Sequence, residues 1–362
     1  MIATVLSAYG IRFEDSHVEP LASGLINKTW KITLARQQYI LQRINDHVFR
    51  RPYELADNLK MLDAYLKKHS PGYLFVAPIT NANNAEVCYI ENEGYYRLLP
   101  FVEGSHTINV VSSPDQAYEA ALQFGKFTRL LSGFDSRKLH LTIPDFHNLT
   151  LRYQQFEEAL KMGNVERIKQ SAHLVAKVKK HVHILTSFEK IRKSSAVKQR
   201  VTHHDTKISN VLFDDHDRGL CVIDLDTVMP GYFISDVGDM MRTYLSPANE
   251  EEKDFSKIAV RDDFFRAIVQ GYLSNMGDEL TPEERDLILY AGLFLIYMQA
   301  IRFLADYFNN DVYYGTSYPE QNFVRAGNQI RLLNALEDQR EAFQEIIAAE
   351  LSKKTYLNLG KV

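Results

Sequence analysis

The sequence has few cysteines and no segment dominated by one charge. Only Cys88 and Cys221 occur among 362 residues. Both lie in apolar, strand-like runs, so a disulfide framework is not expected and a reducing cytoplasm fits. The formal net charge is −4, with no Lys/Arg-rich tract, which argues against nucleic acid or a membrane surface as the principal partner. We therefore expect a small-molecule partner.

Long apolar runs and an export signal are also lacking. Residues 1–10 contain neither a basic segment nor an apolar core of signal length. The longest apolar run, residues 287–298, is too short to cross a bilayer and predicts a buried helix. With 45% apolar and 24% charged residues, the chain is expected to be globular, with a large core and two domains by length.

The most informative segment lies just beyond the middle of the chain. Residues 203–210 read HHDTKISN, which fits H-x-D-x-K-x-x-N, a pattern typical of the catalytic loops that transfer a phosphoryl group from ATP. In this pattern Asp205 accepts the proton of the acceptor hydroxyl and Asn210 binds Mg²⁺. Lys207 is placed to bring its charge near the transferred phosphate. His203 is expected to support the loop by bonding backbone carbonyl groups.

A second motif follows at a spacing that brings it back to the first. Two apolar strands separated by a polar turn occupy residues 211–223, and the sequence Asp-Leu-Asp follows at 224–226. A hairpin here would return Asp224 to the side of Asn210. Mg²⁺ is a hard cation that needs few protein oxygen ligands when phosphates and water supply the rest. Asn210 and Asp224 would suffice, and Asp226 is either a third ligand or a group that holds the loop.

These motifs carry a family resemblance. Together with the DVGDMMR sequence at residues 236–242, the RFLADY sequence at 302–307 and YILQ at 39–42, they resemble the aminoglycoside phosphotransferase and choline kinase superfamily. Within it the chain looks closest to the N-acetylhexosamine 1-kinases, over residues 18–335. The resemblance implies an α+β, protein-kinase-like fold. Residues 1–100 would form the nucleotide-binding lobe, and residues 101–362 a mainly helical lobe with the catalytic loop, metal site and acceptor site.

The hydrophobic pattern agrees with two lobes. A helix is expected at residues 53–68, because leucines recur there at three- and four-residue steps and give an apolar stripe that packs on the sheet. Strands are expected at residues 18–21, 29–34, 39–43, 86–91 and 95–99. Helices are expected at residues 114–131, 151–161, 165–192, 235–245, 263–275, 282–308 and 318–353.

The resemblance places ATP between the lobes, with adenine against the backbone of Phe101, Val102 and Glu103. Gln42 stands where a protein kinase has its phosphate-binding lysine, so Arg43 or Lys28 is expected to supply the missing charge. A phosphate-covering loop would occupy residues 22–28. This segment has a single glycine, so an ordinary hairpin turn is the alternative.

The resemblance also implies a sugar site. Asp205, Arg302, Tyr313 and Tyr314 offer the donors, acceptors and aromatic rings that a sugar ring needs. Arg302 is also expected to form an ion pair with Asp306, one helical turn away. The implied reaction uses ATP and Mg²⁺ to phosphorylate the C1 hydroxyl of an N-acetylhexosamine or related hexose. Leu25 replaces a histidine of the resembling kinases, which leaves a requirement for the acetamido group open.

Three alternatives remain. An aminoglycoside, choline or homoserine type of acceptor is the nearest one. Residues 224–228, DLDTV, also fit the D-x-D-x-[TV] motif of haloacid-dehalogenase-type phosphatases, with Asp224 as the nucleophile. Gln42 suggests the third alternative, a kinase-like module that binds nucleotide without turnover. Sequence does not decide the oligomeric state.

Overall fold

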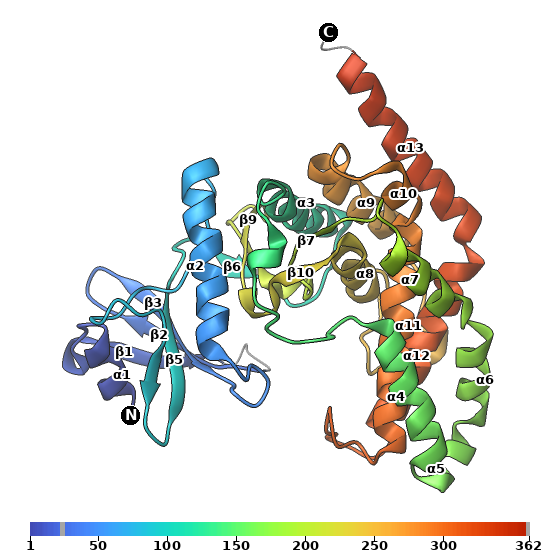
Figure 1. Ribbon diagram of the computed structural model, residues 1–362, viewed down its shortest axis with the longest axis horizontal. Coiled ribbons are helices and arrows are strands. Elements are labelled where there is room, and N and C mark those ends of the chain that lie inside the picture. The colour runs from blue at the N-terminus through green and yellow to red at the C-terminus, as the bar shows by residue number, and fades with distance from the viewer. Residues whose placement is uncertain (22–25, 360–362) are drawn as a thin grey trace.

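The computed structural model describes residues 1–21 and 26–359, with side chains described up to residue 353. The chain forms two lobes, one built on a sheet and one on helices (Figure 1). The smaller lobe contains a five-stranded antiparallel sheet in the order β1-β2-β3-β5-β4. All five predicted strands are confirmed: β1 (His17–Leu21), β2 (Lys28–Thr33), β3 (Gln38–Ile44), β4 (Cys88–Ile90) and β5 (Gly94–Pro100).

Two helices cover opposite faces of this sheet. Side chains alternate between faces along a strand, so β3 directs Leu41 and Ile44 into different cores. Leu41 packs in a small cluster with α1 (Ile2–Ala8), a helix that the sequence pattern did not reveal. Ile44 belongs to the main core, together with the leucines of α2 (Pro52–His69).

The helix α2 lies between the sheet and the larger lobe (Figure 1). Its four stripe leucines are buried in the same core as Phe124 and Phe127 of the larger lobe. The prediction that α2 packs on the sheet therefore describes only part of its contacts. The proposed boundary at residue 100 follows the path of the chain, whereas the main hydrophobic core extends across it.

The larger lobe is mainly helical. Its first helices are α3 (Pro114–Leu130), α4 (Leu149–Met162), α5 (Val165–Gln170), α6 (Ala172–Lys180) and α7 (His183–Lys193). After the catalytic segment follow α8 (Phe233–Tyr244), α9 (Asp262–Met276), α10 (Pro282–Asp286), α11 (Ile288–Phe308), α12 (Gln321–Asp338) and α13 (Arg340–Leu359). The expected helix at residues 165–192 is three helices, and those at 282–308 and 318–353 are two each. Apolar periodicity continues through these breaks because the successive helices face the same core.

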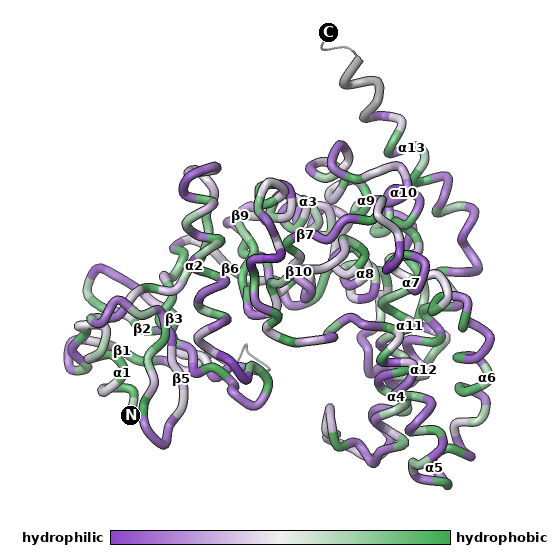
Figure 2. Tube along the Cα trace, viewed as in Figure 1, coloured by the Kyte–Doolittle hydropathy of each residue, from purple (hydrophilic) through white to green (hydrophobic). Residues whose placement is uncertain are grey.

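The helix α11 forms the centre of this lobe. It has 21 residues, and an 18-residue window within it has a mean hydropathy of 1.7, so by length and composition alone it could cross a membrane, unlike the shorter apolar run at residues 287–298. Its most apolar window is 83% buried inside the protein, and Figure 2 shows this hydrophobic segment among the neighbouring helices. The predicted buried helix is therefore confirmed.

Two small sheets join the helices to the catalytic segment. In one, β7 (Gln199–Thr202) pairs with β10 (Met229–Tyr232). In the other, β6 (His106–Thr107), β8 (Val211–Phe213) and β9 (Gly219–Val222) lie in the order β6-β8-β9. The pairing of β8 with β9 confirms the predicted hairpin. In the described part of the chain, all strand pairings within the sheets are antiparallel.

Candidate active site

The hairpin brings the two catalytic motifs together. The amide of Ile223 donates a hydrogen bond of 2.8 Å to the carbonyl of Asn210, so Asp224 directly follows a residue that is bonded to Asn210. Within the loop, the side-chain amide of Asn210 (Nδ2) donates to the backbone carbonyl of Asp205 at 2.9 Å. Lys207 Nζ lies 3.0 Å from Asp205 Oδ2. The four residues expected to act on the phosphate, metal and acceptor are therefore neighbours.

Two carboxylates of α8 hold the loop in this shape. Asp236 accepts hydrogen bonds from the amides of His203 and His204 at 3.2 and 2.8 Å, and Asp239 accepts one from Thr206 at 2.8 Å. The expected helix at residues 235–245 would place both near its beginning. The helix begins earlier, at Phe233, so both carboxylates lie inside it and face the loop. Burial raises the pKa of Asp236 to about 7 despite these bonds.

The two histidines of the loop have different surroundings. His203 Nε2 lies 2.9 Å from the carbonyl oxygen of Ile223, which is consistent with the predicted supporting role. Burial lowers its pKa. His204 has a φ of 68°, and its ring lies edge-on to His147, with the centroids 5.2 Å apart. Burial lowers the pKa of His204 to about 4, so this ring is neutral at physiological pH.

The environment of Asp224 fits a bound cation. This residue lies at the end of the hairpin in the left-handed conformation, with φ 59°. Its pKa is raised to about 7, first by burial and then by the carboxylates of Asp226 and Asp205. Three carboxylates in one place repel one another unless a cation is shared among them. Asn210 and Asp224 together present hard oxygen ligands of the kind that Mg²⁺ binds.

The structure favours a role for Asp226 as a link between the lobes. Its Oδ1 accepts a hydrogen bond from Arg97 on β5 at 2.5 Å, and its Oδ2 accepts one from Asn27 at 2.7 Å. Arg97 and Asp226 are nearly inaccessible, with 2% and 1% of their side chains exposed. Both carboxylate oxygens have partners, which favours the alternative in which Asp226 holds the loop. The metal role of Asp226 stays a prediction.

Arg97 is a buried cation beside Gln42 that no sequence pattern indicates. Its guanidinium donates to Gln42 Oε1 at 2.9 and 2.7 Å, so Gln42 and Arg97 lie side by side on the cleft-facing side of the sheet. Arg43 follows Gln42 and points to the opposite face, where its guanidinium lies beside Gly94. Lys28 pairs with Arg43 in the register. The prediction that Arg43 or Lys28 supplies the missing charge is therefore wrong.

The expected adenine site is partly engaged with the protein itself. The amide of Phe101 donates to Gln38, at 3.2 Å, and Ser105 Oγ donates to the carbonyl of Val102, at 2.6 Å. Glu103 is exposed. Purine recognition by this segment stays a prediction, and it now depends on the carbonyl of Phe101 and the amide of Val102. Most of the expected phosphate-covering loop, including Leu25, falls at residues 22–25, outside the described residues.

A pocket beside the catalytic loop brings Asp205 and Arg302 together. It has a volume of about 80 Å³ and is formed by the catalytic loop, α8, α11 and the segment before α4. The residues that line it are Phe146, His147, His204, Asp205, Asp239, Arg242, Leu295, Gln299 and Arg302. Sequence reasoning had placed only Asp205 and Arg302 here. His204, Asp239 and Arg242 belong to the motifs at residues 203–210 and 236–242 without an expected role in the pocket, and Phe146, His147, Leu295 and Gln299 lie outside any motif.

The tyrosines expected at the sugar site lie beside Arg302. Its guanidinium carbon is 5.7 Å from the ring centre of Tyr313 and 5.4 Å from that of Tyr314. Tyr313 is 71% exposed, so it lies at the rim. Asp306 accepts hydrogen bonds from the amides of Tyr313 and Tyr314 at 2.8 and 3.0 Å. Because its carboxylate holds this loop, the predicted ion pair between Arg302 and Asp306 is wrong.

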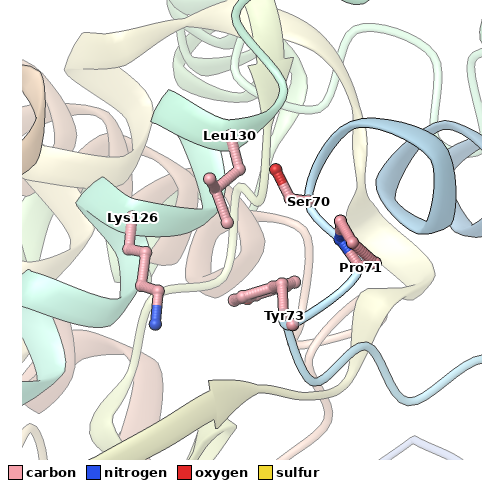
Figure 3. A pocket seen from close by; sticks show the side chains of 6 residues that line it. Ser70, Pro71, Tyr73, Lys126 and Leu130 are labelled. Carbon is pink, nitrogen blue, oxygen red and sulfur yellow. The ribbon is translucent and has the colours of Figure 1, made fainter.

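A second hollow lies away from this chemistry. It has a volume of about 210 Å³ and is formed by the loop after α2 and one face of α3, with Tyr73, Lys126 and Leu130 around it (Figure 3). Its lining has one cation and no carboxylate. It therefore lacks the groups that a phosphoryl-transfer site requires.

Comparison with known proteins identifies the family and supports the fold. Residues 17–279 match the model of the phosphotransferase enzyme family. The chain belongs to this family. The structure of a microcompartment-associated aminopropanol kinase is similar, with a TM-score of 0.63 at 16% identity over 94% of this chain and 97% of that chain. The structure of an amicoumacin kinase in complex with AMP-PNP, Ca²⁺ and Ami is also similar, with a TM-score of 0.61 at 15% identity over 92% of each chain.

A choline kinase from Cryptosporidium parvum Iowa II gives a TM-score of 0.55 at 12% identity, over 93% of this chain and 96% of that chain. At these identities the similarity establishes the kinase-like, two-lobe fold that the resemblance implied. The phosphatase alternative is wrong, because its motif opens a domain of alternating strands and helices. Here Asp224 ends an antiparallel hairpin, and after β10 the described residues form no further strand.

Proposed function

We propose that this phosphotransferase transfers the γ-phosphoryl group of ATP to the anomeric hydroxyl of an N-acetylhexosamine or a related hexose. The products would be ADP and the sugar 1-phosphate. The observation that carries the proposal is the shared pocket of Asp205 and Arg302. It combines a carboxylate that can take a hydroxyl proton with a guanidinium that can bind the oxygens of the same acceptor.

The proposed roles follow from position. Asp205 orients the C1 hydroxyl and accepts its proton as the phosphoryl group is transferred. Lys207, within reach of Asp205, places its ammonium group near the transferred phosphate. Burial acts to lower the pKa of Lys207, but the carboxylates of Asp205 and Asp224 outweigh it and raise the pKa, so the group is charged. Asn210 and Asp224 would hold Mg²⁺, which neutralises phosphate charge when bound.

The charge balance of the pocket favours a neutral acceptor. Arg242 is paired with Asp239 and with Glu250, at 2.9 and 2.7 Å. Burial, followed by the proximity of His204 and Arg302, lowers the pKa of His147 well below its usual range. Among the described residues, no carboxylate lies within ion-pair distance of Arg302. A cationic acceptor such as choline or an aminoglycoside would meet this unpaired charge, whereas a sugar hydroxyl accepts hydrogen bonds from it.

The same observation supports one second candidate. A hydroxy-amino acid of the homoserine type carries a carboxylate, which could form a bidentate pair with Arg302. Its hydroxyl would then face Asp205. This acceptor class therefore belongs in the test beside sugars.

An acceptor screen tests the proposal. The protein is incubated with ATP, Mg²⁺ and a panel of free hexoses, N-acetylhexosamines, their 1-O-methyl glycosides, homoserine, choline and aminoglycosides, and ADP release is followed. We expect turnover of a reducing sugar and none of its methyl glycoside, with phosphate at C1 by phosphorus NMR. Equal turnover of the glycoside, or phosphate at C6, would refute the 1-kinase assignment and leave a sugar kinase. Turnover of homoserine alone would favour the second candidate.

A further inference from the structure

A group of three metal-binding side chains lies outside the catalytic site. His181 and His183 flank the turn between α6 and α7, and Glu337 lies near the end of α12. One ligand atom from each lies within 4.8 Å of those of the other two. His181 Nδ1 is 2.8 Å from Glu337 Oε2, and His183 Nε2 is 3.1 Å from Glu337 Oε1.

The ring of His181 is held with one nitrogen ready for a ligand. Only 2% of the residue is exposed. Its Nε2 lies 2.9 Å from Asn334 Oδ1, one turn before Glu337 on α12. With the amide of Asn334 oriented as in the structure, this contact places the ring proton on Nε2. The lone pair of Nδ1 then points toward the carboxylate of Glu337.

Hydrogen bonding within the protein does not satisfy this nitrogen. His181 Nδ1 is buried and has no hydrogen-bond partner among the described residues, although the carboxylate oxygen is close. A lone pair held against a carboxylate is unfavourable unless a proton or a metal cation lies between the two atoms. A hydrogen bond from the partner nitrogen to an amide oxygen is also the usual support of a histidine that binds a metal.

We propose that His181, His183 and Glu337 form a Zn²⁺ site. Two imidazoles and one carboxylate are ligands that suit this borderline ion, and water would complete the tetrahedron. Bonds of about 2.0–2.2 Å place tetrahedral ligands about 3.4 Å apart. The contacts of Glu337 with His181 and His183, at 2.8 and 3.1 Å, must therefore lengthen slightly when the ion binds. His183 is half-exposed, with 52% of its side chain accessible, so its ring can turn to adjust its position. The bound ion would fasten the α6–α7 turn to α12.

Cobalt provides a direct test, because Co²⁺ occupies zinc sites and its visible absorption is strong only in tetrahedral geometry. Chelator-treated protein is titrated with Co²⁺ in excess Mg²⁺, which fills the oxygen site at Asn210 and Asp224. We expect one strongly absorbing Co²⁺ for each chain, displaced by Zn²⁺. We also expect Zn²⁺ to raise the Tm of unfolding.

Variants show whether these residues are responsible. His183→Ala and Glu337→Gln should abolish both signals, and Asn334→Ala should weaken Zn²⁺ binding roughly 10- to 100-fold. His216→Ala, which removes an exposed imidazole from the β8–β9 turn, should bind like the parent. The proposal fails if the parent gives neither signal, or if His183→Ala keeps both. Circular dichroism confirms that each variant is folded, so that a lost signal reports on ligands.

Discussion

At the scale of the residue, two aspartates of the catalytic segment, Asp205 and Asp224, differ in their surroundings. Asp205 and Asp224 are both partly exposed. Asp205 lines the pocket and contacts Lys207, whereas partial burial and then the neighbouring carboxylates raise the pKa of Asp224 to about 7. The first environment suits a group that must reach a substrate hydroxyl. The second environment suits a carboxylate that binds a metal cation. Two aspartates nineteen positions apart are thus assigned different roles by their surroundings.

Asp205→Asn should reduce kcat by about 10²- to 10⁴-fold, because general-base catalysis contributes on that order. The nucleotide affinity should change little, since the amide keeps the size of the side chain and the metal ligands are intact. Steady-state kinetics and ATP titration measure the two effects. Asp215→Asn, in the exposed hairpin turn, is the matched control. Turnover close to that of the parent would remove Asp205 from this role.

Arg302→Ala should raise the KM for the acceptor far more than the KM for ATP. A lost charge-assisted hydrogen bond costs about 1.5–3 kcal/mol, which corresponds to roughly a 10- to 150-fold increase. Varying each substrate at saturation of the other separates the two constants. Arg12→Ala removes a largely exposed arginine and should leave both unchanged. An equal rise in both constants would mean that Arg302 acts through the fold as a whole.

At the scale of the element, two carboxylates on helices shape the two loops of the site. Asp236 on α8 holds the amides of the catalytic loop. Asp306 on α11 holds the amides of Tyr313 and Tyr314 and also accepts a bond from Asn322, at the start of α12. Neither needs to touch a substrate to matter. Each fixes backbone that a loop alone would leave free.

Asp306→Asn should weaken acceptor binding without changing the chemistry at the phosphate. The amide has one acceptor oxygen in place of two, so the carboxamide cannot serve both loop amides, and an unsatisfied buried donor costs about 1–3 kcal/mol. We expect a lower Tm, a higher KM for the acceptor and an unchanged KM for ATP. Asp338→Asn, on the exposed face of α12, is the control. Unchanged acceptor kinetics would show that this loop does not bind the acceptor.

At the scale of the whole molecule, the lobes are joined by a shared core and a buried ion pair. The leucines of α2 lie in the main core, and Arg97 from β5 pairs with Asp226 from the catalytic segment. Gln42 and Asn27 complete the hydrogen bonds of this pair. The position of the five-stranded sheet relative to the catalytic segment is therefore set by side chains.

Arg97→Met should lower the free energy of unfolding by about 3–5 kcal/mol, because it leaves the carboxylate of Asp226 buried without its cation. Asp226→Asn should also destabilise the protein. The double variant should be less destabilised than the sum of the two, because neither charge is then left alone. Urea denaturation measures all three, and ATP affinity shows whether the cleft keeps its geometry. Additive losses would mean that the two groups do not interact.

Sequence alone predicts the five strands of the smaller lobe, most helices of the larger lobe and the catalytic spacing, but not α1, β6, β7 or β10. The five strands, the leucine stripe of α2 and the hairpin before Asp224 follow from local periodicity and turn chemistry, which act over a few residues. The periodicity does not reveal the breaks at Ser171, at residues 181–182, at Leu287 and at Gln339, because helices on either side of a break face one core.

The contacts between side chains far apart in the sequence depend on the tertiary structure. Arg97 lies 129 positions from Asp226, and Phe146, Arg242 and Gln299 reach the pocket of Asp205 and Arg302 from separate segments. No local pattern encodes such pairs, because they depend on which face of a strand or helix is turned inward. The orientation of β3 also places Arg43 on the far side of the sheet, and the packing of the lobes places Asp226 at the contact between them.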